Sequence, residues 1–166
     1  MKKLGTFLDS LLDRQIQAIV NWGKQPKSDR FWITPEGGYA IRLTNNTGAP
    51  SVKGTIVTAS SAVDNAVVLQ NNEFDAIGPI YEDGIPAGEE VYVVIAGRAQ
   101  VLLQDSTACT RGNLFICSPT DGRALAIANP GSGLPAVETH FKEIGHCTES
   151  VTAGTNKLAW AVVHFN

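Results

Sequence analysis

The sequence is poor in charge and lacks the signature motifs of several enzyme classes. Charged residues make up 17% of its 166 residues, with 13 Lys and Arg against 16 Asp and Glu. The net charge of −3 and the scattering of the basic residues exclude the clustered positive surface that nucleic acids require. No phosphate-binding loop, nucleophile elbow or zinc-protease signature occurs. We therefore expect no nucleic-acid partner and no enzyme of these classes.

Long apolar runs are also missing. No segment approaches the roughly 20 apolar residues that span a bilayer. At the start of the chain, Asp9, Asp13 and Arg14 interrupt the apolar region that a secretion signal requires. With 43% hydrophobic residues, a chain of 166 residues can bury the core of one compact domain. We expect a soluble protein without a membrane partner.

Residues 4–22 show the periodicity of one amphipathic α-helix. Wound at about 100° per residue, they bring their apolar side chains to one face. This candidate contact face consists of Leu4, Phe7, Leu8, Leu11, Leu12, Ile16, Ile19 and Trp22. Gly23 ends the predicted helical region 1–23, and the polar segment 24–30 is predicted to be a linker. The apolar face is suited to docking on the chain's own β-domain or on a partner, and both alternatives stay open.

Beyond residue 30, short β-branched or aromatic runs alternate with turn sequences such as NNTG, EDG and NPGSG. This alternation is typical of small all-β domains and predicts no second helix. The predicted strands are 31–34, 39–44, 54–59, 66–70, 91–95, 99–103, 113–117, 123–128 and 158–165. The expected fold class is therefore mainly β, a barrel or sandwich over residues 31–166, preceded by the N-terminal helix.

The β-region contains an internal repeat. Residues 53–69 align without a gap on residues 111–127, with Gly54 on Gly112 and apolar positions on apolar positions. Downstream, the peptide FDAIG matches FKEIG, and each is followed by an Ala-Gly pair. A duplicated β-unit can pair with its copy to close a barrel or sandwich and to cover exposed sheet edges.

This duplication predicts the organisation of the β-domain. We expect two units, about 31–90 and 91–155, with a closing strand at 158–165. The second unit carries the longer loop, within 128–140. Turn glycines mark the repeat, at Gly54, Gly78, Gly88, Gly112, Gly145 and Gly154.

The stretch HFKEIGHCTES, residues 140–150, gathers groups that could catalyse a reaction or bind a metal. The repeat weakens this interpretation, because His146 falls on Pro79 and Cys147 on Ile80 in the first copy. Zinc requires three or four convergent ligands, and His140, His146, His164 and Cys147 contain no compact pair in a recognised spacing. The nearby carboxylates are expected at solvated strand ends, namely Glu138, Glu143 and Glu149. The sequence therefore predicts no catalytic, metal-binding or cofactor-binding residue.

The three cysteines are expected to be reduced thiols. They form no C-x-x-C pair, and their odd number is poor evidence for a disulfide framework. A free cysteine often behaves as a small buried hydrophobe, which is the expected role of Cys117 and Cys147. Cys109 falls on Ser51 in a turn and could be exposed.

Residues 50–166 carry four features in a fixed order: a glycine after a basic residue, an Ile-Gly pair, an Ala-Gly turn and a final strand of alternating apolar residues. In IPAGEEVYVVIAGRAQVLL, RGNLFICSPTDGRALAI and FKEIGHCTESVTAGTNKLAWAVVHF, this order resembles the small capsid decoration, or cement, proteins of tailed bacteriophages. The resemblance implies a β-rich virion protein on the capsid surface, often a trimer, that binds the major capsid protein and stabilises the head. It transfers no catalytic residue and no cofactor.

Two other functions stay open. One is a host-surface or glycan-binding module of a head or tail fibre, with loop 128–140 and the aromatic residues Trp32, Tyr39 and Tyr81 as candidates. The other is a Cys/His hydrolase or self-processing protein that uses His146 and Cys147. A structural virion protein is the leading hypothesis, made in the host cytoplasm and carrying the N-terminal helix face as an oligomer or capsid contact.

Overall fold

The computed structural model describes residues 30–71, 75–129 and 136–164, which form ten strands and one short helix. The elements are β1 (Phe31–Ile33), β2 (Gly38–Asn45), β3 (Ile56–Ala59), β4 (Ala66–Leu69), β5 (Ala76–Pro79), β6 (Glu90–Leu102), β7 (Leu114–Cys117), β8 (Ala124–Ile127), α2 (Val137–Phe141), β9 (Glu143–Cys147) and β10 (Leu158–Val163). The predicted mainly-β class is confirmed. The predicted helix 1–23 lies outside the described residues. Among the described helices, none has the length and apolar character needed to cross a membrane.

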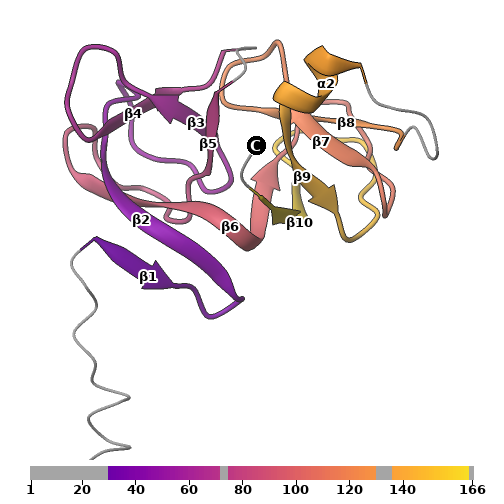
Figure 1. Cartoon of the computed structure of the whole chain (residues 1–166), viewed down its shortest axis with the longest axis horizontal. Coiled ribbons are helices and arrows are strands. Elements are labelled where there is room, and N and C mark those ends of the chain that lie inside the picture. The colour runs from indigo at the N-terminus through magenta and orange to yellow at the C-terminus, as the bar shows by residue number, and fades with distance from the viewer. Residues whose placement is uncertain (1–29, 72–74, 130–135, 165–166) are drawn as a thin grey trace, which may run out of the picture.

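The strands form one sheet in the order β5-β3-β4-β2-β6-β10-β9-β7-β8, with β1 beside β2. The sheet curls into the two lobes seen in Figure 1, and β6 runs from one lobe to the other. In the first lobe, β2 pairs with β4 and β6, β4 pairs with β3, and β3 pairs with β5. A bridge between Ile80 and Val93 joins the end of β5 to β6, and this contact closes a ring of strands.

The second lobe closes in the same way. Strand β6 pairs with β10, β10 with β9, β9 with β7, and β7 with β8. A parallel bridge between Leu103 and Ala124 joins the end of β6 to β8. The corresponding contact in the first lobe is the parallel pairing of β2 with β4, in which Thr44 lies opposite Ala66. Because the pairings correspond one by one, the two lobes are two copies of one unit.

Strand β6 belongs to both units. Its first half corresponds to β10 and its second half to β2, so the change of unit falls near Gly97 instead of before residue 91. The separate strands predicted at 91–95 and 99–103 are one continuous strand. Gly97 has a φ of +85°, and the ladder with β2 shifts register nearby. Such a bulge lets a strand continue through a glycine that otherwise predicts a turn.

Gly78 and Gly145 hold equivalent places inside β5 and β9, whereas the sequence predicts turns at both positions. Each lies at a register shift in the pairing with β3 or β7. A Cβ atom on Gly78 would collide with the carbonyl oxygen of Val94, and one on Gly145 with that of Val162. Only glycine therefore permits the close approach of the neighbouring strand at these two positions.

Three short elements depart from the sequence prediction. β5 and β9 each contain a glycine, and β5 ends at Pro79, so neither has the β-branched run that predicts a strand. Helix α2 begins inside the predicted loop 128–140 of the second unit, where no helix is predicted. The other predicted strands agree with the structure to within a few residues.

The two units pack as one body. One buried apolar cluster contains residues of both units, including Ile56 from the first and Phe115 from the second. The turn between β7 and β8 also reaches the first unit, where the Gly122 N–H donates to the Gln70 carbonyl at 2.8 Å. The Gly122 carbonyl accepts from the Ile56 N–H at 2.9 Å. These contacts and the shared strand β6 fix the orientation of the lobes.

Candidate functional site

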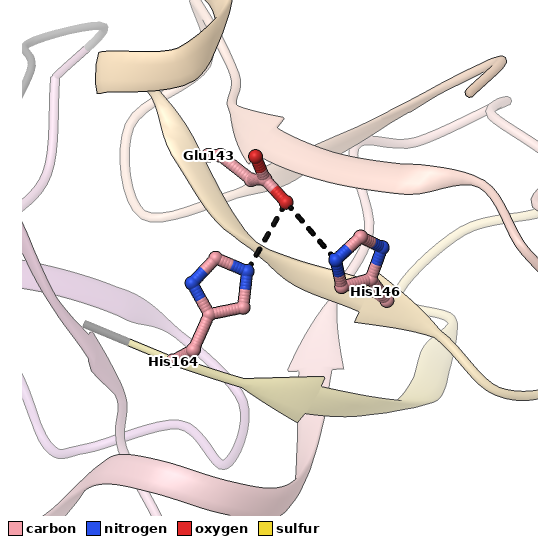
Figure 2. A group of neighbouring side chains, drawn as sticks. All are labelled: Glu143, His146 and His164. Carbon is pink, nitrogen blue, oxygen red and sulfur yellow. Dashed lines mark hydrogen bonds and ion pairs between the residues drawn. The ribbon is translucent and has the colours of Figure 1, made fainter. Parts of the chain in front are cut away.

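Three side chains converge where β9 lies beside the end of β10 (Figure 2). The Oε1 atom of Glu143 is 3.3 Å from His146 Nε2 and 3.1 Å from His164 Nε2. One donor atom from each residue lies within 4.8 Å of the other two. Carboxylate and imidazole groups are ligands of divalent transition metals. We call this group the Glu-His-His cluster.

A β-bulge places Glu143 and His146 on the same face of β9. In a regular strand, residues three positions apart point to opposite faces. The pairing with β7 shifts register between Glu143 and Gly145, so that Ile144 is an extra residue and the alternation is reset. The two side chains therefore meet although their spacing in the sequence is typical of neither a strand face nor a recognised ligand pair.

The third member comes from the C-terminal end of the described chain. Strands β9 and β10 are antiparallel, with Val162 opposite His146. The backbone N–H of His164 donates to the Ile144 carbonyl at 3.2 Å, which continues the pairing beyond β10. The sequence prediction missed this cluster because it depends on a bulge and on a long-range strand pairing.

Burial differs across the cluster. The Glu143 side chain is 9% exposed, whereas those of His146 and His164 are 49% and 36% exposed. The expectation that Glu143 lies at a solvated strand end is therefore wrong. His140, on α2, places its Nδ1 atom 3.9 Å from the other carboxylate oxygen, Glu143 Oε2. The carboxylate thus lies beneath imidazole rings that face the solvent.

His146 and Cys147 do not form a nucleophile–base pair. His146 faces Glu143, whereas the Cys147 Sγ atom lies 2.7 Å from the Glu149 carbonyl oxygen and 3.3 Å from Cys109 Sγ. Neighbouring residues in a strand point to opposite faces, which separates the imidazole from the thiol. The geometry gives the hypothesis of a Cys/His hydrolase no support at this pair.

The three cysteines are buried. The predicted burial of Cys117 and Cys147 is confirmed, since Cys117 is 1% exposed and Cys147 is 3% exposed. The expected exposure of Cys109 is wrong, since it is 3% exposed and its backbone pairs with Val151. Burial, with a further effect of the neighbouring Cys147, raises the pKa of Cys109 to about 12. Burial also raises the pKa of Cys117 to about 12, so both thiols stay protonated at neutral pH.

A cleft of about 560 Å³ lies between the two units. Its lining includes Lys53 and Asp83 from the first unit and Asp121 and Arg123 from the second, around apolar residues such as Leu158. This volume falls within the range of roughly 300–1,000 Å³ that is typical of small-ligand sites. The cleft is the second candidate site among the described residues.

The aromatic residues considered for glycan binding occupy two different environments. Trp32 packs at its edge against Tyr81, with ring centroids 5.0 Å apart, and both rings pack against the buried core. Tyr39 stacks on Phe31 at 5.9 Å on the β1–β2 hairpin. Phe31, Ile33 and Tyr39 are 42%, 56% and 47% exposed, and we call them the hairpin patch. Trp32 and Tyr81 thus pack against the core, whereas Tyr39 belongs to an exposed apolar surface.

The remaining predicted site residues are only partly described. The apolar face of the N-terminal helix and residues 130–135 of loop 128–140 lie outside the described residues. Among the predicted turn glycines, Gly54, Gly88 and Gly112 have left-handed φ angles of +83°, +89° and +87°. Gly154 does not have a positive φ and lies against the Lys157 side chain.

Comparison with known proteins does not assign this chain to a family. No family model and no curated protein matches the sequence. Among solved structures, the chain is similar to the head fiber gp8.5 N base in bacteriophage phi29, with 13% sequence identity and a TM-score of 0.48. The match covers 75% of this chain and 92% of that one. A likeness at this level identifies neither a family nor a function.

Proposed function

We propose that this protein is a structural virion component that binds the outer surface of a phage capsid and stabilises the head. The proposal rests on the resemblance over residues 50–166 and on one structural observation. Two fused β-units form a single body that displays an exposed apolar patch, Phe31, Ile33 and Tyr39, on a hairpin at its edge. Large apolar side chains grouped on a surface commonly mark a contact with another protein.

The mechanism follows from this shape. The shared strand β6 and the inserted Gly122 turn keep the two lobes in a fixed relation, so the protein can transmit load between two points. The hairpin patch contacts the major capsid protein or a neighbouring copy of the chain. Assembly as a trimer makes later contacts form at high effective concentration, which converts modest contacts into strong avidity. A stable interface of this kind buries at least ~1,000 Å².

The test uses purified protein and capsids of the matching phage that lack it. We expect the protein to co-sediment with the capsids and to raise their resistance to heat and osmotic shock. A folded protein that neither co-sediments nor protects the capsids would contradict the proposal.

A surface variant tests the contact. Ile33→Asp should weaken capsid binding by at least about tenfold, because a charged group must lose its water in an apolar interface. Val137→Asp is the matched control, since Val137 is another exposed apolar residue, 73% exposed on α2. If both variants bind capsids as tightly as the wild type, the hairpin patch is not part of the capsid interface.

A second candidate is a glycan-binding module, favoured by the cleft between the units. Polar side chains, among them Asp83 and Arg123, line the cleft around apolar residues, and such a mixed lining suits a sugar ring. A glycan array probed with the wild type and with Asp83→Asn tests it. Binding that Asp83→Asn abolishes would support this candidate, and an array without any binding would count against it.

A further inference from the structure

We propose that the Glu-His-His cluster binds a divalent transition metal ion, with Zn²⁺ as the representative ion, through His146 Nε2, His164 Nε2 and a carboxylate oxygen of Glu143. The ion links β9 to the residue that follows β10. This site is additional to the proposed capsid contact and does not depend on it.

The distances agree with tetrahedral coordination. Zinc binds imidazole nitrogen and carboxylate oxygen at about 2.0–2.2 Å, so two ligands of one tetrahedral ion lie roughly 3.3–3.6 Å apart. The Glu143 oxygen is 3.3 Å from His146 Nε2 and 3.1 Å from His164 Nε2. The three donor atoms already lie within 4.8 Å of one another, so small side-chain rotations complete the geometry.

Charge and access also favour a cation. A glutamate that is 9% exposed carries its charge in a partly desolvated place, where a neighbouring positive charge is strongly stabilising. The two imidazoles lie on the solvent side, 49% and 36% exposed, so an ion can enter from solution. Two histidines and one glutamate are a known zinc-binding set that leaves a fourth position for water.

The first unit shows that the fold does not require these residues. In the paired repeats, Glu143 corresponds to Ala76 and His146 to Pro79, since the two strand pairs have the same bulge. The bridge between Ile80 and Val93 in the first unit corresponds to the pairing of Cys147 with Ala161 in the second. Val93 therefore corresponds to Ala161. Three residues further along each strand, Ala96 corresponds to His164. The same backbone thus exists without any of the three ligands.

The experiment measures Zn²⁺ binding to the full-length, untagged protein after treatment with a chelator. Calorimetry should give one Zn²⁺ ion per chain, and the melting temperature should rise with Zn²⁺ but not with Mg²⁺, which prefers oxygen ligands. His146→Asn and His164→Asn should each weaken Zn²⁺ binding by more than about tenfold. His140→Asn is the comparison variant: it removes an imidazole that contacts Glu143 Oε2 at 3.9 Å but is not a proposed ligand, so it should weaken Zn²⁺ binding far less than either of the other two variants.

Cobalt distinguishes this site from the buried thiols. Co²⁺ bound to the cluster should show visible d–d absorption without the near-ultraviolet charge-transfer band of a thiolate ligand. A thiolate band, or Zn²⁺ binding that survives in both histidine variants, would overturn the proposal. Absence of Zn²⁺ binding to the folded wild type would also overturn it and would leave the cluster as a hydrogen-bonded group. The histidine variants stay informative because both side chains are partly exposed and neither belongs to the buried apolar core.

Discussion

The two units of this protein have the same strand pairings but different side chains at corresponding places. Ser51 in the first unit accepts the Ile85 N–H through its hydroxyl oxygen, at 2.9 Å, whereas the corresponding Cys109 lies in the core. The backbone bonds around both residues are equivalent, since Ser51 N–H donates to Ile85 and Cys109 N–H to Val151. The comparison teaches that backbone pairing and a few glycines define the unit, which leaves individual side chains free to acquire other roles.

The units also differ in how they contact each other. Gly54 lies against the second unit, where its carbonyl accepts the Leu102 N–H at 2.8 Å. The corresponding Gly112 has open space around the position of a Cβ atom. The contact between the copies is therefore asymmetric, although the copies themselves are alike.

The largest effect should come from the glycines that both units require. Gly78→Ala and Gly145→Ala should each lower the free energy of unfolding by about 3 kcal/mol, because the new methyl group collides with a carbonyl oxygen of the neighbouring strand. Urea unfolding of both variants measures the loss. If either variant is as stable as the wild type, the two units are not equivalent at this position.

A smaller effect should separate Gly54 from Gly112. Both residues have left-handed φ angles, +83° and +87°, so alanine costs about 1–2 kcal/mol at either position. At Gly54 the Cβ atom would also lie 2.6 Å from Leu158 Cδ2 and 2.8 Å from the Leu102 nitrogen, which adds about 1–3 kcal/mol.

The control for this comparison is Gly112→Ala itself. Chemical denaturation should rank Gly54→Ala clearly below Gly112→Ala in stability. Equal losses would mean that the close contact between the units at Gly54 does not exist in solution.

Two arginines over aromatic rings should give a still smaller difference. The guanidinium carbon of Arg98 lies 4.3 Å from the ring centroid of Trp160, and that of Arg42 lies 5.7 Å from that of Tyr92. Arg98→Ala should cost about 0.5–1 kcal/mol. Arg42 also forms an ion pair with Glu90 at 3.1 Å, so Arg42→Ala is measured in a Glu90→Gln background. There it should cost less than Arg98→Ala, because the longer distance gives the weaker cation–π attraction. Thermal unfolding of both variants checks this order of stability losses. A larger loss of stability for Arg42→Ala than for Arg98→Ala would contradict the prediction.

The smallest effect is a dependence of stability on alkaline pH, which should not be seen at neutral pH. It comes from the second unit, which holds all three cysteines. The pKa of Cys109 and of Cys117 is raised from 9.0 to about 12 in the folded protein. Unfolded thiols therefore lose their protons first, and the stability that is present below pH 9 should be lost as the pH rises towards 12.

Stability measured at neutral pH and at about pH 10 tests this linkage. Cys117→Ala should be less sensitive to alkaline pH than the wild type. In the native state at neutral pH, a thiol reagent should label none of the three buried cysteines. Rapid labelling of folded protein would show that the second unit opens more readily than its packing indicates.

Much of the fold could be predicted because its pattern is local. The alternation of apolar residues and the aligned glycines predict β3, β4, β7 and β8 at nearly their observed positions. Strands β5 and β9 could not be predicted as strands, because Gly78 and Gly145 interrupt them, although their peptides were recognisable as copies. The continuity of β6 through Gly97 depends on its partner strands on both sides.

The candidate site could not be predicted for a related reason. A comparison of aligned positions sets His146 against Pro79 and so suggests that the histidine has no special role. The structure shows what the aligned positions do not, because Glu143, His146 and His164 meet through a bulge and a pairing of distant strands. Divergence between the copies is therefore compatible with the site that we propose in the second unit.

The sequence by itself determined the mainly-β class, the duplication and the burial of Cys117 and Cys147, because these follow from residue types at regular local spacing. Only the tertiary structure decided that β6 serves both units, that Cys109 is buried and that one carboxylate lies between two imidazoles. Each of these depends on register and on contacts between distant segments. Such contacts follow from the closing of the whole sheet, which no short window of residues contains.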